Sequence, residues 1–134
     1  MAHRIDIRVY YEDTDMAGIV YHANYLKFIE RGRSEAVRAA GIDQRAMLES
    51  DGLAFAVRDM TLEFLSPARF DDILRVESRV EQLRGASIVM VQEVWRSSQK
   101  VFAANVRLAI LQKTGKPSKI PAEISQKLAT LTDK

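Results

Sequence analysis

The sequence predicts an α+β fold in which a largely antiparallel sheet of five strands packs against one long helix, with a short helix near the C-terminus. Three observations lead to this prediction. An alternating segment near the N-terminus is typical of a strand, a long amphipathic segment follows it, and four segments rich in Val, Ile, Leu, Phe and Thr come later. Short connections between those four favour antiparallel pairing, because parallel strands need long crossovers. We expect the 134 residues to form one domain over residues 1–134.

The predicted strands have patterns of two kinds. In residues 4–10, the apolar side chains of Ile5, Ile7 and Val9 alternate with polar ones, which predicts a half-buried strand. The other four are denser in β-branched and aromatic residues, and the breaks between them contain Ser-Pro, Asp-Asp, Arg-Gly and Ser-Ser pairs, which are typical of turns. These four strands are predicted at residues 53–65, 73–83, 87–96 and 101–111.

Two helices are predicted. The long one covers residues 25–40 and is followed by Gly41, the residue type that most often ends a helix. Gly32 in its interior costs about 1 kcal/mol relative to Ala, unless another element packs closely there. The short one begins with Pro121 at its first position and ends near Leu131. The apolar stripe of the long helix is predicted to comprise Leu26, Ile29, Ala36, Val37 and Ala40.

Two of the strands indicate an oligomer. Residues 88–91 are apolar on both faces, and the last strand is nearly so. One helix covers only one face of a sheet, and large exposed apolar patches are rare on monomers. We therefore expect a homo-oligomer, a dimer or a tetramer. The alternative is that the sheet curls tightly and the C-terminal helix covers the rest.

Composition excludes several classes of function. Hydrophobic residues make up 47% and charged residues 28% of the chain, as in ordinary globular proteins. The absence of cysteine excludes a disulfide scaffold, a thiol nucleophile, an iron–sulfur cluster and a cysteine-based zinc site. A net charge of +2 is too small to suggest a partner nucleic acid. No apolar run predicts a membrane span and no secretory signal is visible, so we expect a cytoplasmic protein.

The candidate chemistry lies where the first strand passes into the long helix. His3 and His22 are the only histidines, and no metal-binding or nucleotide-binding motif is present, so we expect neither a metal nor a cofactor. Asp15 precedes a turn with Gly18, and His22 stands just before the helix. Free N–H groups at a helix start stabilise negative charge, so Asp15 and the N–H groups near His22 could form a base or nucleophile with an oxyanion hole. The alternative is ordinary helix capping by the same residues. The spacing does not decide between them.

A resemblance to a known family decides between a catalytic role and helix capping for these residues. The family signature is found in residues 10–38, which read YYEDTDMAGIVYHANYLKFIERGRSEAVR, and the match continues through VRDMTLEFLSPARFDDIL at residues 57–74 and LRGAS at residues 83–87. These segments resemble the hotdog-fold thioesterases of the 4-hydroxybenzoyl-CoA thioesterase family, and most of all the acyl-CoA thioesterases encoded with the bacterial Tol–Pal envelope system. Departures are small: Gly32 and Ser34 stand where that family usually has Ala and Thr.

The resemblance implies a fold and an activity. The hotdog fold is a five-stranded antiparallel sheet wrapped around a central helix, and it forms dimers and often tetramers. The implied reaction is hydrolysis of acyl-CoA to a carboxylic acid and CoA, with no cofactor. The catalytic carboxylate would be Asp15, and the oxyanion donor would be the main-chain N–H of His22. Basic residues near a surface turn, Arg84 and Arg58, would contact the CoA phosphates. The full set of expected substrate-binding residues is Gly18, Tyr21, Tyr25, Arg58, Arg84 and Ser87.

Several points stay open at the level of sequence. Asp15 could attack the thioester directly or activate water, and His22 could act through its imidazole or only through its N–H. Asp13 is expected to serve in the turn or as a cap. The acyl preference is open, as is the carrier, which could be CoA or acyl carrier protein. The competing functions are a binding module for acyl carrier protein or an envelope-linked partner, and a dehydratase of the same fold.

Overall fold

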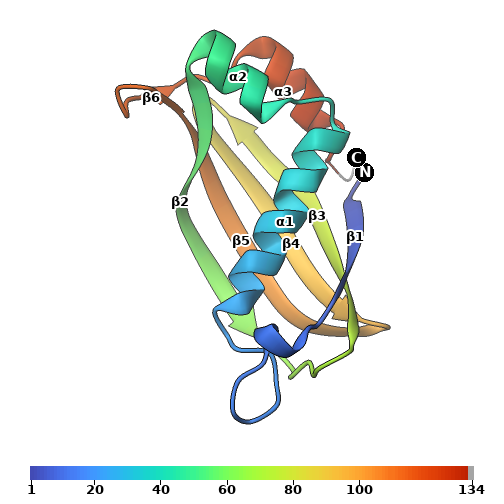
Figure 1. Ribbon diagram of the computed structural model, residues 1–134. Helices are drawn as coiled ribbons and strands as arrows, with labels where there is room; N and C mark the ends of the chain where they lie inside the picture. The colour runs from blue at the N-terminus through green and yellow to red at the C-terminus, as the bar shows by residue number, and fades with distance from the viewer. Residues whose placement is uncertain (133–134) are drawn as a thin grey trace.

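The computed structural model describes residues 1–132 and shows one curved antiparallel sheet with the longest helix lying across its face (Figure 1). The strand order is β1-β3-β4-β5-β2, and a short strand β6 pairs with β5. The strands are β1 His3–Arg8, β2 Leu53–Phe64, β3 Ile73–Arg84, β4 Ser87–Arg96, β5 Gln99–Gln112 and β6 Pro117–Ser118. The helices are α1 Asn24–Ala39, α2 Gln44–Asp51 and α3 Ala122–Ala129, with one turn of 3₁₀ helix at Tyr11–Asp13.

The predicted α+β class and antiparallel pairing are confirmed, but the sheet has six strands, not five. The extra strand β6 lies between the last predicted strand and the short C-terminal helix, where no strand was predicted, and it pairs with the end of β5, for example Ile110 with Ser118. The helix α2 was also missed. Its local signals are present: the Asp43 side chain accepts a hydrogen bond from the N–H of Ala46 at 3.0 Å, and Gly52 ends the helix with φ +67°. Eight residues are too few for a clear apolar stripe.

The buried face of α1 differs in part from the predicted stripe. Leu26 is 37% exposed, whereas Tyr25 and Phe28 are buried. Gly32 lies against β3, and a Cβ atom at this position would come within 2.5 Å of Cγ1 of Val76. The close packing that would justify a glycine inside the helix is therefore present. At the other end of the chain, Pro121 caps α3 and does not occupy its first position.

A buried polar network fixes α1 on the sheet. Gln92 of β4 is fully buried, and its amide nitrogen donates to the carbonyl of Ile29 and to the hydroxyl of Ser78, both at 2.8 Å. Its amide oxygen accepts from Nη1 of Arg33 at 3.0 Å. Because these partners come from α1 and β3, sliding the helix by one residue would leave buried polar groups unpaired.

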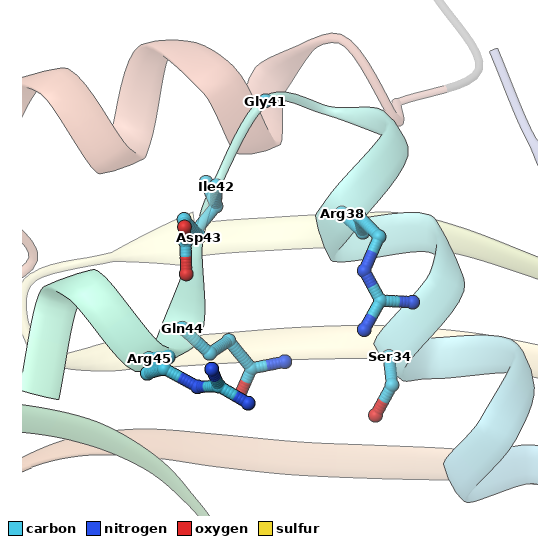
Figure 2. A pocket seen from close by; sticks show the side chains of 7 residues that line it. All are labelled: Ser34, Arg38, Gly41, Ile42, Asp43, Gln44 and Arg45. Atoms are coloured by element: carbon cyan, nitrogen blue, oxygen red, sulfur yellow. The ribbon is translucent and has the colours of Figure 1, made fainter.

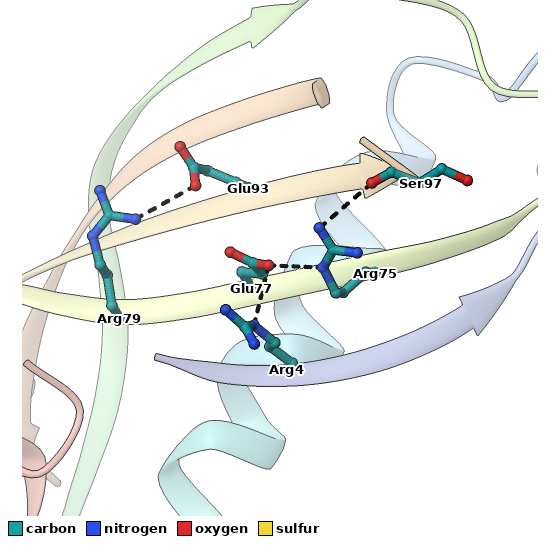
Figure 3. Close-up of polar contacts among 6 residues, drawn as sticks. All are labelled: Arg4, Arg75, Glu77, Arg79, Glu93 and Ser97. Atoms are coloured by element: carbon teal, nitrogen blue, oxygen red, sulfur yellow. Dashed lines mark hydrogen bonds and ion pairs between the residues drawn. The ribbon is translucent and has the colours of Figure 1, made fainter. Parts of the chain in front are cut away.

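The face of the sheet turned away from α1 is not the apolar surface expected from the sequence. Val89 and Val91 do lie there and are half-buried, but they share this face with charged side chains of β3 and β4, among them Glu77 and Glu93 (Figure 3). Glu77 pairs with Arg4 at 3.2 Å and with Arg75 at 2.7 Å. The premise of an exposed apolar face is therefore wrong, and an oligomer has to be argued from another surface. Glu93 also lies on this face and pairs with Lys100 at 2.8 Å and with Arg79 at 3.5 Å.

Candidate active site

The loop between the 3₁₀ turn and α1 is a tight hairpin that presents Asp15. The N–H of Asp15 donates to the carbonyl of Ile19 at 2.9 Å, and the N–H of Gly18 donates to the carbonyl of Asp15 at 3.0 Å. Gly18 has φ +80°, a conformation that costs glycine little. The Oδ1 atom of Asp15 accepts a hydrogen bond from the N–H of Ala17 at 2.9 Å. The side chain is exposed, with one carboxylate oxygen held by the turn and the other free of protein donors within residues 1–132.

This hairpin is fastened to the segment between β2 and β3. The N–H of Val20 donates to the carbonyl of Ala68 at 2.8 Å, and Ile19 forms an isolated bridge with Arg69. Val20 and Ala68 are both buried. The loop therefore has a fixed position relative to the end of the sheet, although it lies outside the main strand ladder.

Asp13 lies two residues before Asp15 but has a different environment. It is buried, and its Oδ2 atom accepts from the N–H of Tyr10 at 2.8 Å. Its Oδ1 atom accepts from the side-chain amide of Asn24 at 2.9 Å. These bonds fasten the 3₁₀ turn to the first residue of α1, which is the structural role expected for Asp13.

The start of α1 offers unpaired backbone donors. Ala23 caps the helix and supplies no side-chain hydrogen bond. Within residues 1–132, no protein acceptor pairs with the N–H of His22 or with that of Ala23. His22 is exposed, and its ring lies 4.5 Å from the ring of Tyr21 and 6.1 Å from that of Phe64, measured between centroids. Unpaired N–H groups at a helix N-terminus are suited to hold an oxyanion.

A cavity of about 450 Å³ brings these groups together. Asp15, His22 and Tyr25 line it from the loop and the helix start, and residues 64–67 line it from the end of β2. Burial raises the pKa of the Tyr25 hydroxyl, although a hydrogen bond with the backbone of Ala68 opposes the shift. The cavity is lined by Asp15, Ile19, Val20, His22, Tyr25, Phe64, Leu65, Ser66 and Pro67.

Residues 64–67 were missed as site residues in the sequence. Their signal is weak, because two consecutive apolar residues at the end of a strand are equally typical of the core. In the structure, Phe64 is 53% exposed and Leu65 is 50% exposed. The ring of Phe64 lies 6.0 Å from that of Tyr25, which in turn stacks on Phe102 at 4.7 Å. Phe64 and Tyr25 give the cavity an aromatic wall suited to an apolar group, and Phe102 supports Tyr25 from the core.

The structure does not bring the other predicted residues into this cavity. Tyr21 contacts the His22 ring from outside the lining, and Gly18 forms the turn. Arg58 lies at a bulge in the middle of β2. Arg84 and Ser87 flank the hairpin between β3 and β4, at the opposite end of the sheet. Eleven residues of extended strand separate Arg84 from the start of β3, a span of roughly 36 Å.

A separate cavity of about 550 Å³ lies at the far end of α1, next to α2. Figure 2 shows Arg38 on α1 and Arg45 on α2 extending into the space between the two helices. Arg38 donates to Glu35 at 2.6 Å, and Asp43 caps α2.

Within residues 1–132, no group of three or more His, Asp or Glu side chains is arranged to hold a metal ion, and no helix is long and apolar enough to cross a membrane.

Comparisons with known proteins agree on one family. The model of the thioesterase superfamily matches residues 17–103, which include α1 and most of the sheet. The chain is 40% identical over 119 residues to acyl-CoA thioesterase YbgC of Haemophilus influenzae, an alignment that covers 88% of each protein.

Solved structures show the same relationship. A probable thioesterase from Bartonella henselae superposes with a TM-score of 0.87 at 38% identity, covering 90% of this chain and all of that one. A mutant 4-hydroxybenzoyl-CoA thioesterase crystallised with 4-hydroxybenzoyl-CoA gives a TM-score of 0.91 at 20% identity, covering 95% and 98% of the two chains, which supports the fold alone. The chain therefore has the hotdog fold, is an enzyme, and belongs to the thioesterase superfamily.

Proposed function

We propose that this chain hydrolyses acyl-CoA to a carboxylic acid and CoA, with Asp15 as the catalytic carboxylate and the N–H of His22 as the oxyanion donor. The observation that carries the proposal is the 450 Å³ cavity, whose wall contains both Asp15 and the unpaired helix start at His22. The relatives named as acyl-CoA thioesterases support the choice of substrate class.

The helix start supplies the electrostatic part of the reaction. A thioester carbonyl that points its oxygen at the His22 N–H gains a hydrogen bond as negative charge develops on that oxygen. One such donor typically stabilises the transition state by about 3–4 kcal/mol. Within residues 1–132, the imidazole of His22 has ring contacts but no hydrogen-bond partner. This arrangement favours the backbone as the catalytic group and the ring as packing.

Asp15 supplies the carboxylate in one of two ways. In the first, its free oxygen attacks the carbonyl carbon, the C–S bond breaks, CoA leaves as the thiolate, and water then hydrolyses the mixed anhydride. In the second, Asp15 takes a proton from the water that attacks the carbonyl. A single turnover in ¹⁸O-water distinguishes them, because hydrolysis of an anhydride at the Asp15 carbonyl places ¹⁸O in the protein.

We propose a homo-oligomer, with a dimer formed through the edge of β2 as its basic unit. β2 is twelve residues long and ends the sheet, and an unpaired strand edge is a template for pairing with another chain. Val57 and Phe64 are exposed along it. Because Arg84 and Ser87 lie far from the cavity of their own chain, they would contact CoA bound to a second copy.

The remaining expectations belong to the same proposal. Acyl carrier protein is the alternative carrier of the acyl group. The purely binding role for this fold is not favoured, because the relatives are named as enzymes. The single domain, the cytoplasmic location, the absence of a cofactor and the link to the Tol–Pal system stay predictions.

The test measures thiol release from a panel of short, long and aromatic acyl-CoAs, using a thiol-reactive dye. The chain contains no cysteine and gives no background. Asp15→Asn should lower kcat/KM by about 10²–10⁴-fold, because the charge is lost while the shape is kept. Glu12→Gln, an exposed carboxylate three residues away, serves as the matched control and should leave the rate unchanged. Equal rates for wild type and Asp15→Asn would remove Asp15 from the mechanism.

A further inference from the structure

Two separate cavities lie along α1 on the side of β2. The helix packs against β1, β3 and β4. On the β2 side lie the cavity that contains Asp15 and a further cavity of about 170 Å³. The first is lined by the start of α1 and the end of β2, and the second by the middle of α1 and the start of β2, so both lie along the same two elements. The side chains that matter in the second cavity are Glu30, Arg33, Ser34, Val37, Phe55 and Leu108.

Arg33 is the unusual residue of this second cavity. It is half-buried, and burial lowers the pKa of its guanidinium, although the charge of Glu30 opposes the shift. Nη1 donates to Gln92, which is itself held by the buried network, so the guanidinium has a fixed orientation. Within residues 1–132, no carboxylate lies within ion-pair distance of Arg33. Arg38, five residues later, has such a partner in Glu35.

A half-buried guanidinium without a contacting anion is energetically unfavourable unless a ligand supplies one. Glu30 lines the cavity and is a candidate for that anion, but it is on the exposed side of α1. Its carboxylate accepts a hydrogen bond from the hydroxyl of Ser34 at 2.7 Å. The remaining N–H groups of Arg33 are thus available to a ligand in this cavity. The apolar part of the lining, which includes Val37 and Phe55, suits a hydrocarbon chain that leads up to it.

The distance along the helix sets the length of that chain. Tyr25 lines the first cavity and Arg33 the second, and eight helical residues separate them. Eight residues correspond to about 12 Å, the length of an extended acyl chain of roughly ten carbons.

We propose that Arg33 forms the far end of the acyl site and binds a carboxylate at the distal end of the acyl group. The preferred substrates are then CoA half-thioesters of dicarboxylic acids of about ten carbons. The inference rests on the proposed function, because it takes the thioester carbon to lie beside Asp15. A carboxylate would form charge-assisted hydrogen bonds with the free side of the guanidinium.

The experiment compares the mono-CoA thioester of decanedioic acid with decanoyl-CoA. Wild type should prefer the carboxylate-bearing substrate about ten-fold in kcat/KM, and Arg33→Gln should reduce the preference to about one. Arg33→Lys should retain part of it, because the charge stays but the planar fork is lost. Arg31→Gln is the control, since Arg31 is exposed on the same helix and points elsewhere. Thermal unfolding of each variant shows whether it is folded.

Three results would overturn the inference. These are equal rates for the two substrates in wild type, a preference that survives in folded Arg33→Gln, or a stronger preference for 10-hydroxydecanoyl-CoA. If decanoyl-CoA is hydrolysed in an Asp15-dependent way without discrimination, only the inference fails. If neither ester is hydrolysed, the proposed function fails, and calorimetric binding of both esters to Asp15→Asn, with and without Arg33→Gln, still decides the role of Arg33.

Discussion

Asp13 and Asp15 have the same side chain in opposite environments. Asp13 is buried and accepts hydrogen bonds from Tyr10 and Asn24, whereas Asp15 is exposed and is held only by its own turn. A carboxylate with both oxygens bonded to the protein contributes to stability. One that keeps an oxygen free remains available for chemistry.

This contrast predicts opposite effects of substitution. Asp13→Ala should lower the free energy of unfolding by about 2 kcal/mol, because it leaves two partners without an acceptor. Asp15→Ala should change stability by no more than about 0.5 kcal/mol while removing activity. Urea unfolding and thiol-release assays on both variants measure the two quantities separately. A large loss of stability in Asp15→Ala would contradict the assignment.

At the level of single residues, sequence patterns found Asp15 and His22 only as one of two alternatives, and the family resemblance decided between them. Phe64 and Leu65 were not predicted as site residues, because their exposure depends on where β2 ends relative to α1. Such a relation between segments forty residues apart has no local signature.

At the level of elements, the charged face of β3, β4 and β5 has a definite pH dependence. Burial alone would raise the pKa of Glu93, but the hydrogen bond and charge of Lys100, together with Arg79, outweigh it, so the pKa lies below its ordinary value of 4.5. The folded state therefore prefers ionised Glu93. Its stabilising contribution is present above the ordinary pKa and is lost as the pH falls through the lowered one.

Glu93→Gln tests this directly. At pH 7 the variant should be less stable than wild type by about 1 kcal/mol, and the difference should shrink as the pH falls below about 4. Urea unfolding across that range gives the difference, with Glu63→Gln, which is exposed and neighbours the same face, as control. A difference that stays constant with pH would show that the ion pairs are not its source.

The elements themselves were predicted to different degrees. The bounds of β4 agree with the prediction, because its strongly apolar run lies between two turn signals. The short elements α2 and β6 were missed, since eight and two residues are too few to show a period. The prediction of an apolar surface on the outer face, the face of the sheet turned away from α1, was wrong for a different reason. The patterns of β4 and of the last strand were considered without that of β3, whereas Glu77, Arg75 and Arg79 reach that face from β3.

At the level of the whole molecule, the open edge of β2 predicts association. Light scattering at micromolar protein should give a mass of about 30 kDa or a multiple of it, since one chain has 15.2 kDa. Val57→Lys should shift the mass toward one chain, because a charge on an edge strand opposes pairing. Val89→Lys, on the outer face, is the control and should leave the mass unchanged. A clean mass of one chain for wild type would contradict the proposed dimer.

Much of the candidate site lies on two short connecting segments, the hairpin at residues 14–20 and residues 65–72, which are joined through Val20, Ala68 and the Ile19–Arg69 bridge. Neither segment contributes to the main ladder of the sheet. Mutations that accumulate in residues 65–67 can therefore reshape the cavity without disturbing the strands or the position of Asp15. During divergence of related genes, such a division lets substrate preference drift quickly on a scaffold that changes slowly.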